Sequence, residues 1–280
     1  MFIVDSNFAS GSTGIPLSAE PIFHIAGLAV TNSMIYGIMI GSLLIAMFTW
    51  AARRTQIKPV SKMVFAIESL VDFVVDLGEQ NFGDRKKALK FMPLLLTLFV
   101  FILFSNLISL FPGVGTVSVA TPEGEFPLLR AFTADLNATL AMAVLTVGTV
   151  QVAALRELGL KRHIKHYFTM VSSNILSPIN LFVGLIEIMG EFIRVMTLSL
   201  RLFGVIYAGE VLINVVGQLA GNLGWAATFP VYLIEIFFGL IQAYLFMMLA
   251  MVYLAIATRN DHAEHDDHSV DTAKPVTIGT

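Results

Sequence analysis

The sequence predicts an all-α integral membrane protein with five membrane crossings and one interfacial amphipathic helix, ending in a long tilted helical hairpin. Hydrophobic residues make up 56% of the 280 residues and charged residues 13%, against about 25% charged residues in soluble domains. The apolar runs reach the roughly 20 residues that an α-helix needs to cross a bilayer. We therefore expect a single membrane domain, 1–280. The absence of cysteine excludes disulfides and thiolate metal sites.

The N-terminal part consists of a polar segment, 1–31, and a first predicted span, 32–52. Segment 1–31 contains no Lys or Arg and is expected to lie on the outer side. The span carries Gly37 and Gly41 at the GxxxG spacing that can form a helix-packing face. Four basic residues follow it, namely Arg53, Arg54, Lys58 and Lys62.

Segment 61–82 predicts a different kind of helix, because its apolar and acidic residues lie on separate faces. The acidic residues recur at spacings of four, four and three. Such an amphipathic helix is expected to lie at the membrane interface and not to cross the bilayer. The acidic face consists of Glu68, Asp72, Asp76 and Glu79, and the apolar face of Val64, Phe65, Ile67, Leu70, Val71, Val74 and Leu77.

Two further spans are predicted at 91–111 and 134–155. A Pro-Gly pair ends the first, and a polar loop separates it from the second. Asp135 and Asn137 stand at the start of the second span, where their side chains are candidate helix caps. Basic residues precede the first of these spans and follow the second.

The C-terminal part predicts a hairpin of two long helices, 174–217 and 226–258, joined by a Gly-rich turn. The first helix far exceeds the roughly 20 residues of a simple crossing, so it must tilt, lie partly along the interface or kink. The remaining residues, 259–280, form a polar cytoplasmic tail that is expected to be disordered.

The distribution of Lys and Arg orients the crossings. Fourteen of the 17 Lys and Arg residues follow the first span, the third span or the last helix, whereas Arg130 alone lies on the opposite side. Cytoplasmic segments carry the excess of positive charge in membrane proteins. The pattern therefore predicts an outer N-terminus and a cytoplasmic C-terminus. The two remaining arginines, Arg194 and Arg201, lie within the membrane.

Arg201 lies in the middle of the hydrophobic run LSLRLFGVIYAGEVL, residues 198–212. A charge at the centre of the bilayer costs roughly 2.5–3.5 kcal/mol on insertion scales. Intramembrane charges usually face a bundle interior or a wet cavity and mark an ion or substrate pathway. The alternative is a structural arginine that is paired with a buried carboxylate.

Other polar residues share the side of the helix on which Arg201 lies. Past Arg201 this side continues as Gly204 and Ala208, whose small size lets a facing helix approach closely. On a helix that turns about 100° per residue, the polar residues Asn180, Glu187, Glu191 and Arg194 fall within about 20–80° of Arg201.

Carboxylates are predicted on both sides of Arg201 along the membrane normal. Glu210 lies about 180° around the helix from Arg201 and about 13 Å further along it, at 1.5 Å per residue. On the last helix, Glu235 and Gln242 are seven residues apart and share a face. The predicted topology places Glu187 on the cytoplasmic side of Arg201, and Glu210 and Glu235 on the outer side.

These charges have two interpretations. Glu187, Glu191 and Arg194 can be i, i+4 and i, i+3 ion pairs that only neutralise one another within the helix. Glu210 and Glu235 have no basic neighbour in the sequence. A proton relay in a wet cavity is therefore favoured for them.

The motif RLFGVIYAGE, residues 201–210, resembles the RLFGxxxAGE signature of subunit a of the rotary F-type ATP synthase. The resemblance extends over most of the chain through AVTNSMIYG, NLISLFP, TADLNATLAMA and LIQAYLFMMLAMVYLAIA. It implies a stator subunit whose two offset half-channels and essential arginine couple proton flow to c-ring rotation and ATP synthesis. It also implies a non-catalytic chain with neither an ATP site nor a cofactor.

The resemblance assigns roles to individual residues. It makes Arg201 the stator arginine and Gln242 the glutamine that faces it. Glu210 and Glu235 are assigned to the outer half-channel, and Glu187 to the inner one. Asn106 of the second span is also implied, with Glu191, Arg194 and Asp135 as secondary candidates.

The chain departs from the family pattern at three positions. Many members have Asn at the position of Val205, and some have Asp at that of Ser109 or His at that of Glu235. These departures concern the detailed outer path of the proton.

The resemblance also implies partners and a location. The partners are the c-ring, the peripheral-stalk b subunits and the lipid bilayer, with no nucleic acid. The location is a bacterial inner membrane, with an organellar inner membrane as the alternative.

Two other classes of protein are alternatives to this family. A secondary transporter with a carboxylate relay tends to show internal repeats and broken helices, and the sequence shows no such repeat. An intramembrane enzyme needs a nucleophile–base pair or a metal cluster, and no His lies in a predicted span. The tail residues His262, His265 and His268 could bind a metal, but a solvated acidic tail is favoured because metal ligands need a folded site.

Overall fold

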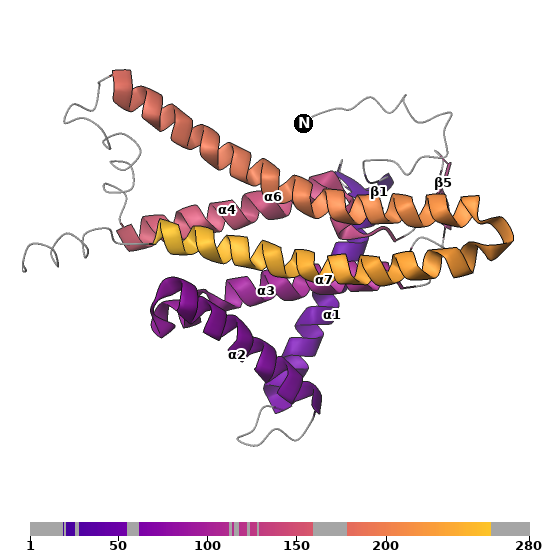
Figure 1. Cartoon of the computed structure of the whole chain (residues 1–280), viewed down its shortest axis with the longest axis horizontal. Helices are drawn as coiled ribbons and strands as arrows, with labels where there is room; N and C mark the ends of the chain where they lie inside the picture. Colours follow the sequence, from indigo (N-terminus) through magenta and orange to yellow (C-terminus); the bar gives the residue numbers. More distant parts are fainter. Residues whose placement is uncertain are drawn as a thin grey trace, which may run out of the picture.

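The computed structural model describes residues 19, 21–25, 28–54, 62–111, 114, 118–121, 124–127, 129–158 and 178–258. Within these residues the fold is almost entirely helical. The α-helices are α1 (Asn32–Arg54), α2 (Lys62–Phe82), α3 (Arg85–Ser109), α4 (Leu136–Leu158), α6 (Pro178–Leu219) and α7 (Gly224–Ala257) (Figure 1).

Short elements occupy the loops. Strands β1 (Pro21–Ile25) and β2 (Leu28–Thr31) form one antiparallel hairpin, and β4 (Ser118–Thr121) and β5 (Gly124–Pro127) form another. The 3₁₀ turns η2 (Phe132–Ala134) and η3 (Gly221–Leu223) precede α4 and α7. The sequence analysis predicted none of these strands.

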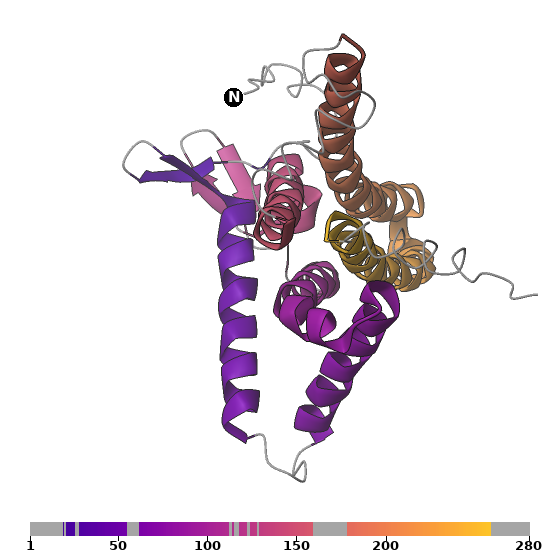
Figure 2. The same ribbon diagram turned by 90° about the vertical axis from the view of Figure 1, so that its left-hand side faces the viewer.

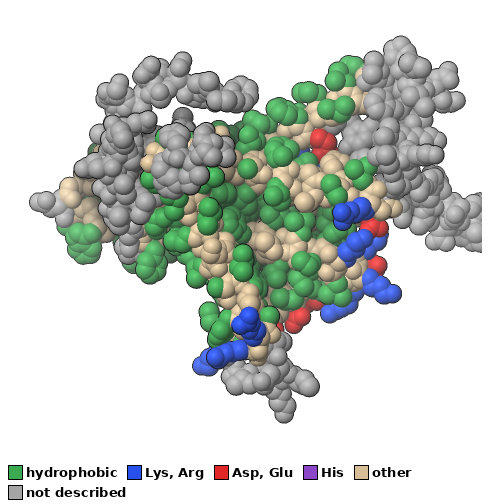
Figure 3. Space-filling view, turned by 180° about the vertical axis from the view of Figure 1, so that it is seen from behind, with side chains coloured by type: hydrophobic (Ala, Val, Ile, Leu, Met, Phe, Trp, Pro, Cys, Tyr) green, Lys and Arg blue, Asp and Glu red, His purple; other side chains and the backbone are tan. Residues whose placement is uncertain are grey.

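Among the residues that the structure describes, five helices are long and apolar enough to cross a membrane, namely α1, α3, α4, α6 and α7. The predicted fold class, an all-α integral membrane protein, is therefore confirmed. Helix α2 is not one of the five. Hydrophobic side chains cover most of the face seen in Figure 3, and Lys and Arg gather toward its lower and right-hand ends.

The helices run in two directions. Helices α3, α4, α6 and α7 lie side by side along the long axis of the molecule, and α1 runs across them (Figures 1 and 2). Both strand hairpins lie near the N-terminal end of α1 (Figure 2). The long hairpin of α6 and α7 is therefore strongly tilted relative to α1.

The core lies where these two directions meet. Tyr36 and Ile40 of α1, Ile102 of α3, Leu202 of α6 and Met247 of α7 are all buried in one hydrophobic cluster. Helices in a bilayer associate through close van der Waals packing, so this cluster is a main stabilising contact among them.

Helix α3 begins at Arg85, six residues before the predicted start of the second span. Asp84 caps it, since a side-chain oxygen of Asp84 accepts a hydrogen bond from the Lys86 backbone N–H at 2.9 Å. The basic residues before the predicted span therefore belong to the first turns of the helix. Near this end, Lys90 forms an ion pair with Glu157 of α4, so the basic ends of α3 and α4 meet.

Gly37 and Gly224 each allow a close contact between elements. A Cβ added at Gly37 would lie 2.6 Å from the Phe132 ring, so α1 packs closely against η2 here, whereas nothing lies within 4 Å at Gly41. Of the predicted GxxxG pair, only Gly37 is a packing position. At the turn between α6 and α7, a Cβ on Gly224 would lie 2.9 Å from the Gly217 carbonyl oxygen. Gly221 has φ +52°, which favours glycine.

Candidate ion-translocation site

Helix α6 carries most of the charged residues singled out in the sequence. Glu191, Arg194, Arg201 and Glu210 follow one another along it. Glu187 also lies in α6, but its side chain is outside the described part of the structure.

Arg194 is neutralised within the chain. Its Nη1 lies 2.5 Å from Glu191 Oε1, and its guanidinium carbon lies 4.3 Å from the centre of the Tyr253 ring on α7. The ion pair lies within α6, and the cation–π contact ties α6 to α7. For Arg194 and Glu191 the structure favours the ion-pair interpretation.

Arg201 behaves differently, although it lies on the same side of α6. It is half-buried, and it makes no hydrogen bond or ion pair with any residue that the structure describes. The adjoining surface is open, because Gly204 and Ala208 are exposed and a Cβ added at Gly204 would meet no atom within 4 Å. An intramembrane charge of this kind needs a counter-charge or water.

Glu210 and Glu235 come close together from different helices. Glu235 of α7 is only 5% exposed, and its carboxylate lies directly on Gly209. A Cβ at Gly209 would fall 1.9 Å from Glu235 Oε2, so only glycine leaves room for this carboxylate. Glu210 is the next residue along α6, and the two negative charges interact. The structure therefore brings together the two carboxylates predicted to share the outer path.

Asn106 connects three elements beside these carboxylates. Its Nδ2 donates a hydrogen bond to the Gly239 carbonyl oxygen at 3.2 Å, and its Oδ1 accepts one from Thr133 Oγ1 at 2.9 Å. Gly239 is one turn after Glu235 on α7. Asn106 of α3 therefore fixes α7 and η2 relative to one another.

Asp135 has the geometry of a helix cap. One of its carboxylate oxygens accepts a hydrogen bond from the Asn137 backbone N–H at 3.0 Å, and the other accepts one from Ser33 Oγ at 2.7 Å. The first contact caps α4, and the second holds the start of α4 against the start of α1. Asn137, the other candidate cap, lies inside α4.

Several polar atoms in this region are buried without a hydrogen-bond partner among the described residues. They are Ser105 Oγ, Glu191 Oε2, Glu235 Oε1 and Gln242 Nε2. Such atoms are rare in native proteins and are typical of places that meet water or a transported ion. Gln242 is buried on the same side of α7 as Glu235, and no hydrogen bond joins Gln242 to Arg201 in the described structure.

The sequence analysis missed Arg130, which it counted only as a loop charge. This residue is buried beside η2, and its positive charge attracts Glu210. One feature of the sequence could have identified it, because Arg130 is the only Lys or Arg between Lys90 and Arg156.

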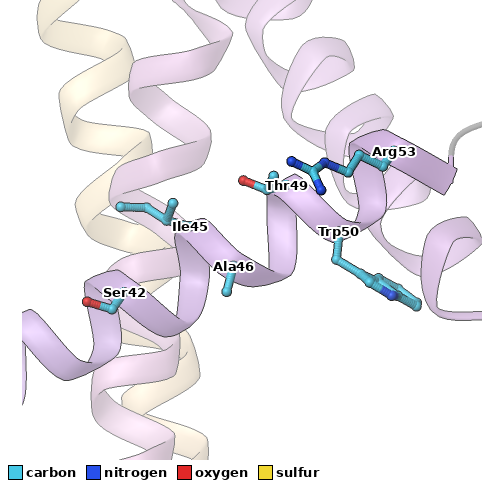
Figure 4. Close-up of a pocket in the computed structure, with 6 residues that line it drawn as sticks. All are labelled: Ser42, Ile45, Ala46, Thr49, Trp50 and Arg53. Atoms are coloured by element: carbon cyan, nitrogen blue, oxygen red, sulfur yellow. The ribbon is translucent and has the colours of Figure 1, made fainter.

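An open groove elsewhere on the surface is separate from these residues. It runs along α1 and is lined by Ser42, Ile45, Ala46, Thr49, Trp50 and Arg53 (Figure 4). All of its lining residues come from α1, and it includes none of the charged residues of α6 or α7.

Comparison with known proteins identifies the family. Residues 34–255 match the family model described as ATP synthase A chain. The chain belongs to the ATP synthase subunit a family. It is 34% identical over 248 residues to ATP synthase subunit a of Oceanobacillus iheyensis, covering 86% of this chain and 96% of that protein. It is also 31% identical over 256 residues to ATP synthase subunit a of Acidothermus cellulolyticus, covering 89% and 86% of the two chains.

One of the similar proteins is named for the ion that it transports. The chain is 33% identical over 240 residues to "ATP synthase subunit a, sodium ion specific" of Propionigenium modestum, covering 85% of this chain and 78% of that protein. As a subunit a, the chain is the stator part of the ion channel in the membrane sector of ATP synthase, and a multi-pass membrane protein.

Proposed function

We propose that this chain forms two offset proton half-channels with Arg201 between them, and so couples proton flow to rotation of a c-ring. The observation that carries this proposal is the contrast between the two intramembrane arginines. Arg194 is held by Glu191 and Tyr253, whereas Arg201 has no partner in the described residues and lies beside an open surface of small residues. A charge kept available in this way suits a counter-charge supplied by another subunit.

The outer half-channel is formed around Glu210 and Glu235. The Glu235 carboxylate lies against Gly209, the neighbour of Glu210 on α6, and Asn106 holds the surrounding helices together. The inner half-channel begins on the other side of Arg201, near Glu187. Glu210 and Arg201 are about 13 Å apart along α6 at 1.5 Å per residue, so neither half-channel crosses the membrane alone.

A coupled cycle follows from this placement. A proton that enters through the outer half-channel neutralises a carboxylate of the ring, which can then turn into the lipid. A ring carboxylate that arrives from the other side meets Arg201, whose charge favours the ionised form, and its proton leaves toward Glu187. Because the guanidinium keeps its charge, Arg201 also repels a proton moving directly between the half-channels. Each charge that moves down 100 mV supplies roughly 2.3 kcal/mol.

The partners of the exposed surface follow from the same proposal. Large apolar side chains on α6 and α7 are exposed, which suits contact with the apolar helices of a c-ring and with lipid. They include Ile193, Leu200, Leu212, Ile236, Phe237 and Leu240. The peripheral-stalk b subunits are the other proposed partners. The proposed location is a bacterial inner membrane, in which the excess of Lys and Arg favours an outer N-terminus and a cytoplasmic C-terminus.

The test is proton flux through Arg201→Ala complexes. We expect this substitution to abolish ATP synthesis and ATP-driven pumping, while protons leak passively through the membrane sector. Arg201→Lys keeps the charge but loses the planar fork, so it should couple poorly and leak less than Ala. The measurements are proton flux in vesicles stripped of the soluble sector, with and without Na⁺, and a blot for the ring and stator subunits. Assembled Arg201→Ala complexes that synthesise ATP at normal rates would contradict the proposal.

A further inference from the structure

Arg130 is buried, although it comes from a loop between two membrane spans. Only 6% of the residue is exposed, and its Nη2 donates a hydrogen bond to the Ala134 carbonyl oxygen at 3.3 Å. The side chain therefore folds over η2 instead of extending toward solvent. A buried guanidinium retains its charge, and such a charge is normally compensated nearby.

The turn that Arg130 covers is held from several sides. Ala131 and Ala134 are buried against Ile206 of α6. The ring of Phe132 lies edge-on to Phe101 of α3, with centroids 5.4 Å apart. The Phe132 ring also packs on Gly37 of α1, and Thr133 donates to Asn106 of α3. Arg130 is consequently positioned by three helices.

These contacts place Arg130 against the part of α6 that carries Glu210. Glu210 is four residues after Ile206, so the two lie on nearly the same side of the helix, about 40° apart. The positive charge of Arg130 attracts the Glu210 carboxylate. Arg201, the other cation of this helix segment, is nine residues away from Glu210, or about 13 Å along the axis.

We propose that Arg130 is a positioning residue of the outer half-channel, which holds the ionised Glu210 carboxylate toward η2 and releases it when a proton arrives. This inference rests on the proposed function. When a proton neutralises Glu210, the attraction to Arg130 ends and the carboxyl group is free to turn toward Glu235. Once Glu210 has passed the proton on, it is again a carboxylate and returns to Arg130. The guanidinium thus directs each proton inward without carrying one itself.

The first test compares variants of Arg130 in the assembled enzyme. ATP-driven proton pumping into inverted membrane vesicles is measured per assembled complex. We expect Arg130→Lys to keep at least half of the wild-type rate and Arg130→Gln to lose at least fivefold. Arg54→Gln removes an exposed cation at the end of α1 and should pump at the wild-type rate. Pumping by Arg130→Gln within twofold of wild type would overturn the proposal, and so would equal losses for Lys and Gln.

The second test separates the effect of the charge at position 130 from the effect of packing. It applies also if Arg130→Gln does not assemble. The imidazole of Arg130→His is largely charged at pH 6 and largely neutral at pH 8. Pumping relative to wild type at the same pH should be at least threefold higher at pH 6. Dividing by the wild-type rate accounts for the other titratable groups that face this site, namely Tyr36 of α1, Asp135 before α4, Tyr207 and Glu210 of α6 and Glu235 of α7. The same fraction at both pH values would overturn the proposal.

Arg201→Ala in the same vesicles separates the role proposed for Arg130 from the function proposed for the whole chain. If it uncouples and leaks as expected while Arg130 can be replaced freely, only the role of Arg130 is wrong. If Arg201→Ala pumps normally, the proposed function itself is wrong.

Discussion

At the scale of single residues, two arginines on one side of α6 have different environments. The sequence placed Arg194 and Arg201 about 20° apart around the helix and offered ion-pair partners within α6 only for Arg194. The structure pairs Arg194 with Glu191 and Tyr253 and leaves Arg201 beside exposed small residues. The difference arises on α7, because the residue opposite Arg194 is an aromatic ring that can cover its charge.

Replacing Arg194 should therefore affect assembly more than proton leak. Arg194→Gln removes the charge that neutralises Glu191 and the contact that ties α6 to Tyr253. We expect fewer assembled complexes and less than a twofold rise in passive proton flux per complex. Arg201→Gln, the matched variant on the same side of the helix, should assemble and leak. The measurements are a blot of purified membranes and proton flux in stripped vesicles. A strong leak through assembled Arg194→Gln would mean that Arg194 shares the blocking role of Arg201.

Gly209 offers a second test at this scale. Gly209→Ala would place a methyl group 1.9 Å from Glu235 Oε2, so the carboxylate must leave its position beside Glu210. We expect ATP-driven pumping to fall at least tenfold. Glu235→Asp is shorter by one methylene and should restore part of the rate in the Gly209→Ala background. Gly148→Ala is the matched control, since nothing lies within 4 Å of that position, and it should pump normally.

At the scale of elements, apolar run length and spacing were sufficient to predict the helices but not the loop structure. Helices such as α1 and α7 follow from long apolar runs, and α2 follows from its separate acidic face. The two strand hairpins were missed because four- and five-residue strands with Gly, Pro and Thr show little alternation. The early start of α3 was missed because the span was predicted from the apolar run that begins at 91, although Asp84 in the basic stretch before it is a helix cap.

Asn106 tests how the elements around the outer carboxylates are held together. Asn106→Leu removes the hydrogen bonds to Gly239 and Thr133, so the buried Thr133 hydroxyl loses its acceptor and the Gly239 carbonyl loses its second donor. Leaving the hydroxyl unsatisfied costs about 1–3 kcal/mol. We expect a lower melting temperature of the solubilised complex and at least threefold slower pumping. Thr133→Val removes only one of the two contacts and should have a smaller effect. Equal melting temperatures for wild type and Asn106→Leu would show that other contacts hold α3 against α7.

At the scale of the whole molecule, the site depends on contacts between residues that are distant in the sequence. Arg201, Glu210 and Glu235 were selected as charges within apolar runs, helical spacing indicated the face that each occupies, and the family resemblance implied their roles. It could not show that Arg130 lies against the segment of α6 that carries Glu210, because that contact depends on how η2 packs. The side chain of Glu187, the residue predicted for the inner path, lies outside the described residues.

The orientation of the whole molecule decides which carboxylates face outward. The basic ends of α3 and α4 meet at the Lys90–Glu157 ion pair, and α1 ends at Arg53 and Arg54. Because these charges belong to segments assigned to one side, we expect that side to be the cytoplasm. The prediction can be checked with single cysteines, since the chain contains none of its own.

In intact cells, Ser118→Cys in the loop between α3 and α4 should react with a membrane-impermeant maleimide. Lys86→Cys at the exposed start of α3 should react only in inverted vesicles, where the cytoplasmic side faces out. Both variants lie outside the proposed half-channels, so their ATP-driven pumping reports that the complexes are assembled and correctly folded. The opposite labelling pattern would reverse the molecule in the membrane. Glu210 and Glu235 would then line the cytoplasmic half-channel, and Glu187 the outer one.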